Sequence, residues 1–265
     1  MIVLQALLIY AIVGAVVGVL AGMLGIGGGL VVVPALVLIF TAAAMDEAII
    51  TQLAVGTSLA TIIITALIST WSHHKKTAVL WPLFKRLAPG ITIGAIIGAF
   101  IATRISSNNL KQVFGIFEIL IALQMVLPSQ FNKRQPKVPD QAMTFVGMVI
   151  GAISALLGIG GGTLTVPYLS WQQIGIRQAV ATAAACGIPI AISGALSYII
   201  MGYYDPRLPA YALGFVYWPS TLCIGLVAIL TVPTGVMLAH RLPTHLLRKI
   251  FAVCLLLLGV SMIIM

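Results

Sequence analysis

Two copies of a glycine-rich motif, Leu-Gly-Ile-Gly-Gly-Gly, are the residues of this chain whose types and spacing most clearly suggest chemistry. The first copy occupies residues 24–29 and the second residues 157–162, and a proline follows each copy, Pro34 or Pro167. Each glycine destabilises a helix by about 1 kcal/mol relative to alanine, and a proline removes a backbone donor. Because both copies lie in apolar sequence, they predict a helix break at membrane depth.

A helix that begins just after such a break directs its N–H groups and the positive end of its dipole towards the gap, which favours an anion. Broken backbone is tolerated in a membrane only where it is buried in protein or lines a wet cavity. The motif residues and those directly after them are therefore predicted to bind an anionic substrate: Gly27, Gly28, Gly29, Leu30, Gly160, Gly161, Gly162 and Thr163. The alternative is a tight hairpin or close helix packing without a ligand.

Hydroxyl and basic side chains elsewhere in the chain could complete an anion site. Thr57 and Thr182 occupy matching positions of an internal repeat, and Ser58 adjoins the first of them. In membrane helices such hydroxyls often bond only the carbonyl one turn back, so both interpretations stay open. Arg177 is expected near a helix start, where it could attract an anion from the cytoplasm or anchor the chain at lipid headgroups.

Glu118 is the only acidic residue within a predicted apolar segment. Intramembrane carboxylates suggest a functional role, and proton coupling is the role considered for this one. The alternative is an inward-facing acid paired with an arginine, or an acid close enough to the helix end to reach the interface.

Catalytic and metal-binding groupings are not recognisable in the sequence. It holds five acidic residues and four histidines, without an HExxH, GxSxG or Ser/His/Asp arrangement. His73 and His74 form a charge cluster with Lys75 and Lys76, and no carboxylate or cysteine lies beside them. We therefore expect no enzymatic activity, no cofactor and no bound metal.

Composition identifies the environment of these residues. Of the 265 residues, 61% are hydrophobic and 7% are charged, whereas about 25% are charged in a soluble domain. The apolar content would supply about eight spans of ~20 residues. The net charge of +9 would suggest nucleic acid in a soluble chain, but the basic residues lie in loops, where they set membrane orientation. The sequence predicts a polytopic membrane protein whose partner is the bilayer and not nucleic acid.

An internal repeat divides the chain into two halves. Besides the two motifs, residues Ala54–Ala60 match Ala179–Ala185. The predicted units are residues 1–128 and 142–265, joined by a polar linker at 129–141. Further matches pair Trp81–Pro82 with Trp218–Pro219 and Arg104 with Arg241.

Each half contains five apolar segments, which predicts an all-α fold. In the first half they are residues 2–22, 30–44, 49–70, 83–103 and 110–127. In the second half they are residues 143–157, 163–171, 179–201, 218–239 and 246–264. The second segment of each half is short, so it either crosses the membrane or forms a re-entrant hairpin with the first.

The distribution of basic residues predicts how the halves are oriented. If each half crosses the membrane an odd number of times, three of the 14 Lys and Arg residues, namely Arg104, Lys111 and Arg207, lie opposite all the others. An even number of crossings would divide the basic residues almost equally. The sequence therefore predicts repeats of inverted topology, with the N- and C-termini outside and the linker in the cytoplasm.

The paired LGIGGG motifs, each followed by Val-Pro, and the AVGTSLA segment resemble those of the TauE/SafE sulfite exporter family of membrane permeases. The resemblance covers essentially the full length. It implies transport of small sulfur oxyanions such as sulfite, or of organosulfonates, across the bacterial inner membrane. It places the family's glycine motifs on Gly25–Gly29 and Gly158–Gly162 and its Thr-Ser pair on Thr57 and Ser58, whereas Ala183 replaces the serine in the second half.

These features predict a secondary transporter or facilitator, and more specifically an exporter, of a small anion that works by alternating access between two inverted repeats. Two alternatives stay open. One is an anion channel, and the other is a membrane-embedded assembly partner without transport activity. The sequence is also compatible with a homo-oligomer.

Overall fold

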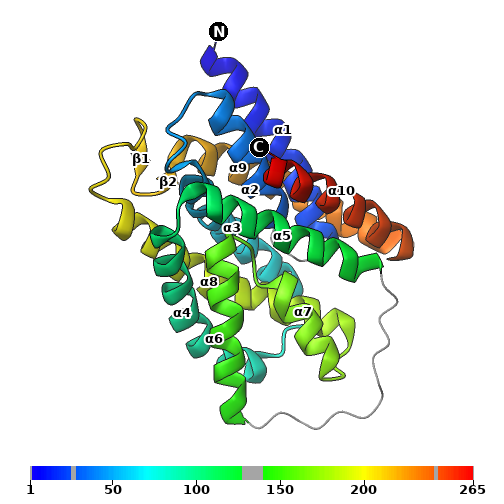
Figure 1. Cartoon of the computed structure of the whole chain (residues 1–265). Helices are drawn as coiled ribbons and strands as arrows, with labels where there is room; N and C mark the ends of the chain where they lie inside the picture. The colour runs from blue at the N-terminus through cyan, green and yellow to red at the C-terminus, as the bar shows by residue number, and fades with distance from the viewer. Residues whose placement is uncertain (1, 25–27, 127–139, 242–243, 265) are drawn as a thin grey trace.

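The computed structural model describes residues 2–24, 28–126, 140–241 and 244–264. Over these ranges the chain forms ten α-helices and one short β-hairpin (Figure 1). In chain order they are α1 (Ile2–Leu24), α2 (Gly29–Ala42), α3 (Ile50–His74), α4 (Trp81–Arg104), α5 (Ser107–Val126), α6 (Asp140–Leu157), α7 (Gly162–Trp171), α8 (Ile176–Gly202), β1 (Ala212–Leu213), β2 (Val216–Tyr217), α9 (Trp218–Arg241) and α10 (Thr244–Ile264).

Each of the ten apolar segments predicted from the sequence corresponds to one observed helix. The predicted linker lies almost wholly outside the described residues. The hairpin was not anticipated. It pairs Ala212 with Tyr217 and Leu213 with Val216 in the loop between α8 and α9, and its two-residue strands are too short to give a clear alternating pattern.

Among the described residues, four helices are long and apolar enough to cross a membrane: α3, α4, α8 and the Trp218–Gly235 part of α9. The apolar windows of α3 and α8 are 72% and 67% buried, whereas those of α4 and α9 are 44% and 39% buried. Helices α3 and α8 therefore form the centre of the molecule, and α4 and α9 lie at its periphery. This arrangement is that of a multi-pass membrane protein.

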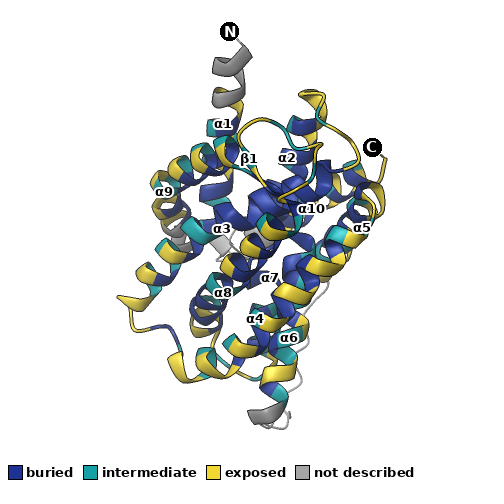
Figure 2. Ribbon diagram, turned by 90° about the vertical axis from the view of Figure 1, so that its left-hand side faces the viewer, coloured by how far each residue is buried: buried dark blue, intermediate teal, exposed yellow. Residues whose placement is uncertain are grey.

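The outer helices have exposed faces (Figure 2), and many of the exposed residues are large and apolar. Large exposed residues recur along each of them. Examples are Leu8 and Ile12 of α1, Ile93, Ile97 and Phe100 of α4, Ile116, Leu120 and Leu123 of α5, and Leu222, Leu226 and Leu230 of α9. A belt of this kind would be unstable in water and is stable against lipid acyl chains.

Helices of the two halves pack mainly on each other. Helix α1 packs on α9, and α4 packs on α6. Helix α3 packs on α8, and α5 packs on α10. Small residues permit this close contact, since a Cβ atom at Gly94 would overlap the Met148 carbonyl oxygen and one at Gly14 would lie 2.9 Å from the Ile224 carbonyl oxygen.

Helices α3 and α8 run in opposite directions. Near one end of the α3–α8 contact Leu59 lies beside Gly194, and further along α3 Ala66 lies beside Gly187. Residue numbers thus rise along α3 as they fall along α8. The same antiparallel relation holds for α5 and α10, because Gly115 lies against Ile263 and Ile119 lies against Gly259.

Candidate functional site

Both glycine motifs interrupt a helix, as the sequence predicted. Helix α1 ends at Leu24 and α2 begins at Gly29, and α6 ends at Leu157 and α7 begins at Gly162. Gly28 precedes α2 with a φ of 75°, and Gly158 has a φ of 67°. Side chains with a Cβ atom disfavour this left-handed region, so glycine is the natural residue at both positions. The predicted site residue Gly27 lies outside the described residues.

The motifs of the two halves meet directly. A Cβ atom at Gly29 would lie 2.5 Å from the Gly158 carbonyl oxygen and 2.8 Å from the Ile159 Cα atom. Ser58 of α3 donates a hydrogen bond to the same Gly158 carbonyl oxygen at 2.8 Å. Leu30, the residue after the first motif, is buried in the main hydrophobic core. The backbones of the two helix breaks therefore pack directly against each other beside α3.

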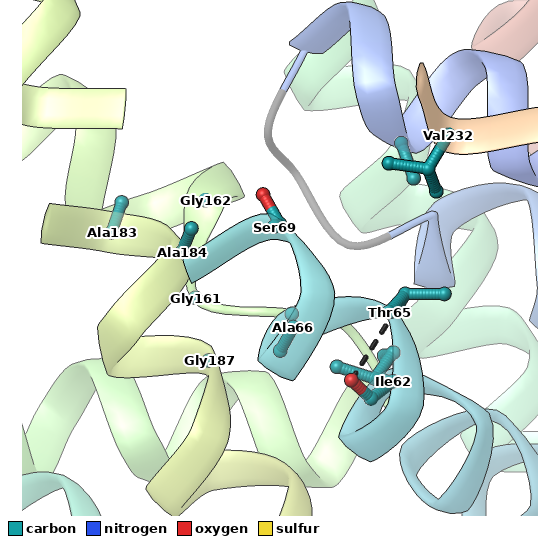
Figure 3. Close-up of a pocket in the computed structure, with 12 residues that line it drawn as sticks. Ile62, Thr65, Ala66, Ser69, Gly161, Gly162, Ala183, Ala184, Gly187 and Val232 are labelled. Atoms are coloured by element: carbon teal, nitrogen blue, oxygen red, sulfur yellow. Dashed lines mark hydrogen bonds between the residues drawn. The ribbon is translucent and has the colours of Figure 1, made fainter. Parts of the chain in front are cut away.

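A cavity lies next to this contact. Its walls come from the second motif, from the small residues of α8, from polar and apolar residues of α3, and from one residue each of α1 and α9 (Figure 3). The lining residues are Gly160, Gly161, Gly162, Ala183, Ala184, Gly187, Ile62, Thr65, Ala66, Ser69, Ala21 and Val232. None of these side chains carries a formal charge. We call this space the glycine-lined cavity.

The glycine-lined cavity is tight in this structure. Its volume is about 10 Å³, which accommodates roughly one water molecule. An oxyanion of several heavy atoms fits only if the walls separate.

The N-terminal end of α7 forms part of the cavity wall. Gly161 precedes α7 and Gly162 begins it, so the N-cap residue has no side chain that could cap this helix end. A Cβ atom at Gly161 would lie 2.7 Å from the Ala183 carbonyl oxygen and 2.8 Å from the Gly187 nitrogen. Thr163, in the first turn, is 5% exposed, and its hydroxyl has no hydrogen-bond partner among the described residues. An uncapped helix N-terminus favours an acceptor or an anion.

Thr57 and Thr182 make equivalent hydrogen bonds in the two halves. The Thr57 hydroxyl accepts a bond from the Tyr217 backbone N–H at 3.0 Å and donates one to the Leu53 carbonyl oxygen at 2.6 Å. The Thr182 hydroxyl accepts one from the Leu80 backbone N–H at 3.0 Å. Leu80 and Tyr217 are the residues just before the repeated Trp-Pro pairs. Each threonine thus holds the loop that starts a helix of the other half.

The predicted ligands do not all surround the same space. Gly160, Gly161 and Gly162 line the glycine-lined cavity, and Thr57, Ser58 and Thr182 are buried but are not among its lining residues. Arg177 lies exposed in the first turn of α8, away from the cavity walls. A role for these side chains in binding substrate therefore stays a prediction.

Glu118 lies apart from the cavity, between α5 and α10. Its side chain is fully buried, and neither carboxylate oxygen has a hydrogen-bond partner among the described residues. A Cβ atom at Gly259 would lie 3.1 Å from the Glu118 Cβ atom. Among the described residues, no arginine forms a hydrogen bond with Glu118, so the predicted pairing with an arginine is not found there.

Two cavity residues of α3 were not singled out from the sequence. Thr65 and Ser69 follow Thr57 and Thr61 at intervals of four residues, so the four hydroxyls share one face of the helix. Thr57, Thr61 and Thr65 are buried, and Thr65 and Ser69 line the cavity. The four-residue spacing was the signal that could have revealed this hydroxyl stripe.

A multi-pass bundle in which two broken helices meet at an internal cavity is the architecture of a membrane transporter. The chain belongs to the sulfite exporter TauE/SafE family, whose sequence model matches residues 10–262. A probable membrane transporter protein of Haemophilus influenzae is 35% identical over 97% of each chain. One of Methanocaldococcus jannaschii is 32% identical over 89% of this chain and 87% of its own. No solved structure matches the chain.

Proposed function

We propose that this membrane transporter carries a small anion, either sulfite or an organosulfonate, across the bacterial inner membrane. The observation that carries the proposal is the contact between Gly29 and Gly158 beside a cavity lined by the backbone of Gly160–Gly162. Backbone N–H groups at a helix start bind anions without the desolvation of a buried cation. The name of the family supports sulfur oxyanions as the class of substrate.

The proposed architecture is a pair of repeats of inverted topology. The antiparallel relation of α3 to α8, and of α5 to α10, supports it. An axis that interchanges antiparallel membrane-crossing helices lies in the membrane plane, which is the symmetry of many secondary transporters. Under this symmetry α1 corresponds to α6 and α9 to α4, and the α1–α9 and α4–α6 pairs fit it because each becomes the other when the halves are exchanged.

Alternating access is the proposed mechanism. Because the glycine-lined cavity admits about one water molecule, binding and release require one set of helices to move against the other. The reciprocal bonds from Thr57 to Tyr217 and from Thr182 to Leu80 join the halves at equivalent points. Ser58, Thr57 and Thr182 would become substrate ligands if these contacts open during the movement. An open channel would not require such a tight cavity.

Glu118 is the proposed coupling residue. A fully buried carboxyl group without a hydrogen-bond partner among the described residues is the kind of group that takes up and releases protons in transporters. If the anion moves with a proton, Glu118→Gln should abolish stimulation by a pH gradient while leaving counterflow of the anion intact. Unchanged stimulation would remove Glu118 from the mechanism.

The proposed orientation follows the charge count, with both termini outside and the linker in the cytoplasm. Arg177 would then lie at the cytoplasmic face, where it attracts the anion. A reporter fused after Met265 that is active only in the cytoplasm should be inactive. Activity of that fusion would reverse the orientation.

Transport by the purified full-length chain in proteoliposomes tests the function. Radiolabelled sulfite and methanesulfonate should show saturable uptake and counterflow, whereas sulfate and chloride should be carried more slowly. Flux that does not saturate and follows voltage would instead indicate the channel. Absence of flux for all four anions would favour the assembly partner.

A further inference from the structure

A second and wider hollow lies at the N-terminal end of α3. Its volume is about 700 Å³. It is lined by the first turns of α3 and α5, the last turn of α4, the C-terminal half of α2, the loop before α3, and two residues of the loop that follows α8. Those two residues are Arg207 and Phe215. We call this hollow the basic vestibule.

Three of its lining side chains are cationic. Arg104, Lys111 and Arg207 all face this one hollow, and Glu47 is the acidic residue among those that line it. The three cations come from the end of α4, the first turns of α5 and a distant loop, so only the tertiary structure brings them together. They are also the three basic residues that the charge count places on the side opposite the others.

The cations differ in how far they are already engaged. Arg207 forms a two-point ion pair with Asp205, at 2.8 Å from its Nε atom and 2.6 Å from its Nη2 atom. The Arg104 guanidinium lies 4.9 Å from the centre of the Phe100 ring. A guanidinium over an aromatic ring keeps its charge and its N–H donors. Arg104 and the half-buried Lys111 are therefore the cations best able to accept an anion.

Two helix N-termini meet at the same hollow. The Thr51 backbone N–H donates to the Ser107 hydroxyl at 3.1 Å, and the Thr51 hydroxyl donates to the Ser107 carbonyl oxygen at 2.9 Å. These bonds hold the starts of α3 and α5 side by side. Their dipoles add positive potential to that of the cations.

A buried amide with unused capacity also lines the vestibule. Gln52 is 4% exposed; its Nε2 atom donates to the Ile105 carbonyl oxygen at 2.8 Å, and its Oε1 atom has no partner among the described residues. A buried polar atom without a partner is destabilising. A hydrated or protonated oxyanion in the hollow would supply the missing bond.

We propose that the basic vestibule is a binding site for small oxyanions and sulfonates, separate from the glycine-lined cavity. This proposal rests on the proposed function only for the identity of the anion. Phe215 links the vestibule to α3, because its carbonyl oxygen packs against Gly56 and Tyr217, two residues on, bonds Thr57. The hairpin thus lies between the vestibule and the hydroxyl stripe. An anion held in the vestibule waits outside this barrier.

The repeat supplies a counterpart at the other end. Arg177 and Arg241 stand at the positions of Gln52 and Arg104, and Arg248 stands at the position of Lys111. Inverted repeats therefore place basic residues at both ends of the transport path.

A cysteine in the vestibule tests the site without relying on transport. Asn108 lines the hollow, and the adjacent Asn109 is exposed but is not one of its lining residues. Asn108→Cys and Asn109→Cys would each be treated with the anionic reagent sulfonatoethyl methanethiosulfonate and with its cationic trimethylammonioethyl analogue. The wild-type chain, with its own three cysteines, gives the background rate.

The anionic reagent should modify Asn108→Cys about 10-fold faster than the cationic reagent, relative to their rates with a free thiol. Arg104→Gln and Lys111→Gln, added together, should reduce this preference to about twofold or less. Methanesulfonate replacing gluconate at constant ionic strength should protect Asn108→Cys saturably and protect Asn109→Cys little. Lys85→Gln, a change of the same charge at the opposite end of α4, should alter none of these rates.

Equal rates for the two reagents, or a preference that survives the double substitution, would overturn the vestibule site. Protection that is equal at both cysteines, or that does not saturate, would show a general electrostatic effect of the anion and would also overturn the vestibule site. Because the glycine-lined cavity plays no part in the reaction, a chain that fails to transport sulfite but retains selective protection would refute the proposed function and keep the vestibule. Near-native thermal unfolding of each variant excludes misfolding as the cause.

Discussion

The glycine-lined cavity and the basic vestibule lie along the same helix, α3, and offer an anion opposite environments. The cavity is bounded by backbone, hydroxyls and small apolar side chains and holds about one water molecule. The vestibule is wide and has three cations on its walls. Charged side chains at a hydrated opening attract an anion without losing their own hydration. In a tight interior they would have to be desolvated, or they would bind the anion too strongly for release. We therefore expect the vestibule to attract the anion and the cavity to select which anion passes.

The largest effect is expected from filling the cavity wall. Gly161→Val should reduce sulfite flux by at least about 100-fold, because even a Cβ atom there would lie 2.7 Å from the Ala183 carbonyl oxygen and overpacking distorts the surrounding backbone. Gly175→Ala is the matched control, since its Cβ atom would meet only the Gln178 amide oxygen at 4.0 Å. Flux like that of the wild type in Gly161→Val, with the protein correctly inserted, would remove the cavity from the path.

The vestibule cations should affect a different kinetic constant. Arg104→Gln with Lys111→Gln should raise the KM for methanesulfonate about 10-fold and leave the maximal rate within about twofold. The KM of the wild-type chain should rise with ionic strength, and that of the double variant should rise less. A fall in maximal rate at unchanged KM would show that these cations act on helix movement and not on capture.

A smaller effect is expected where α3 contacts the second motif. Ser58→Ala removes the hydrogen bond to the Gly158 carbonyl oxygen, which contributes about 1 kcal/mol and should lower flux about fivefold. Ser72→Ala provides the comparison, because the Ser72 hydroxyl bonds the Ile68 carbonyl oxygen within α3 and not another element. Equal effects of the two changes on transport would indicate a general loss of helix stability.

The smallest effect concerns the balance of charge at the vestibule. Asp205→Asn frees the Arg207 guanidinium and should lower the KM for methanesulfonate about twofold. The hydrogen bond from Arg207 holds the pKa of Asp205 below its ordinary value of 3.8, so the carboxylate stays ionised above that pH and protonates only as the pH falls through the lowered value. Between pH 5 and 8 the effect of Asp205→Asn on KM should therefore be constant. A twofold difference that disappears towards pH 5 would contradict this.

Much of the fold could be predicted because its signals are local. Glycine and proline disfavour helix wherever they stand, so both motifs were recognised as breaks, and the hydropathy of each segment located all ten helices. The hairpin around Phe215 escaped prediction because it depends on bonds to other elements, such as that from the Phe215 N–H to the Tyr198 carbonyl oxygen.

The site was predictable only in part. Gly160–Gly162 carry a conformational signal that the sequence displays, and they line the cavity. Thr65 and Ser69 were missed because hydroxyls are common on membrane helices and most of them bond their own backbone. The choice among such hydroxyls depends on which helix face points inward.

The sequence by itself determined that the chain lies in a membrane and that a helix ends at each copy of the glycine motif, because hydropathy and backbone propensity act over a few residues. Only the tertiary structure decided that Gly29 meets Gly158, that Thr57 and Thr182 hold loops of the opposite half, and that Arg104, Lys111 and Arg207 share one hollow. These contacts join residues distant in the chain. They depend on how the helices pack, which no short window of sequence specifies.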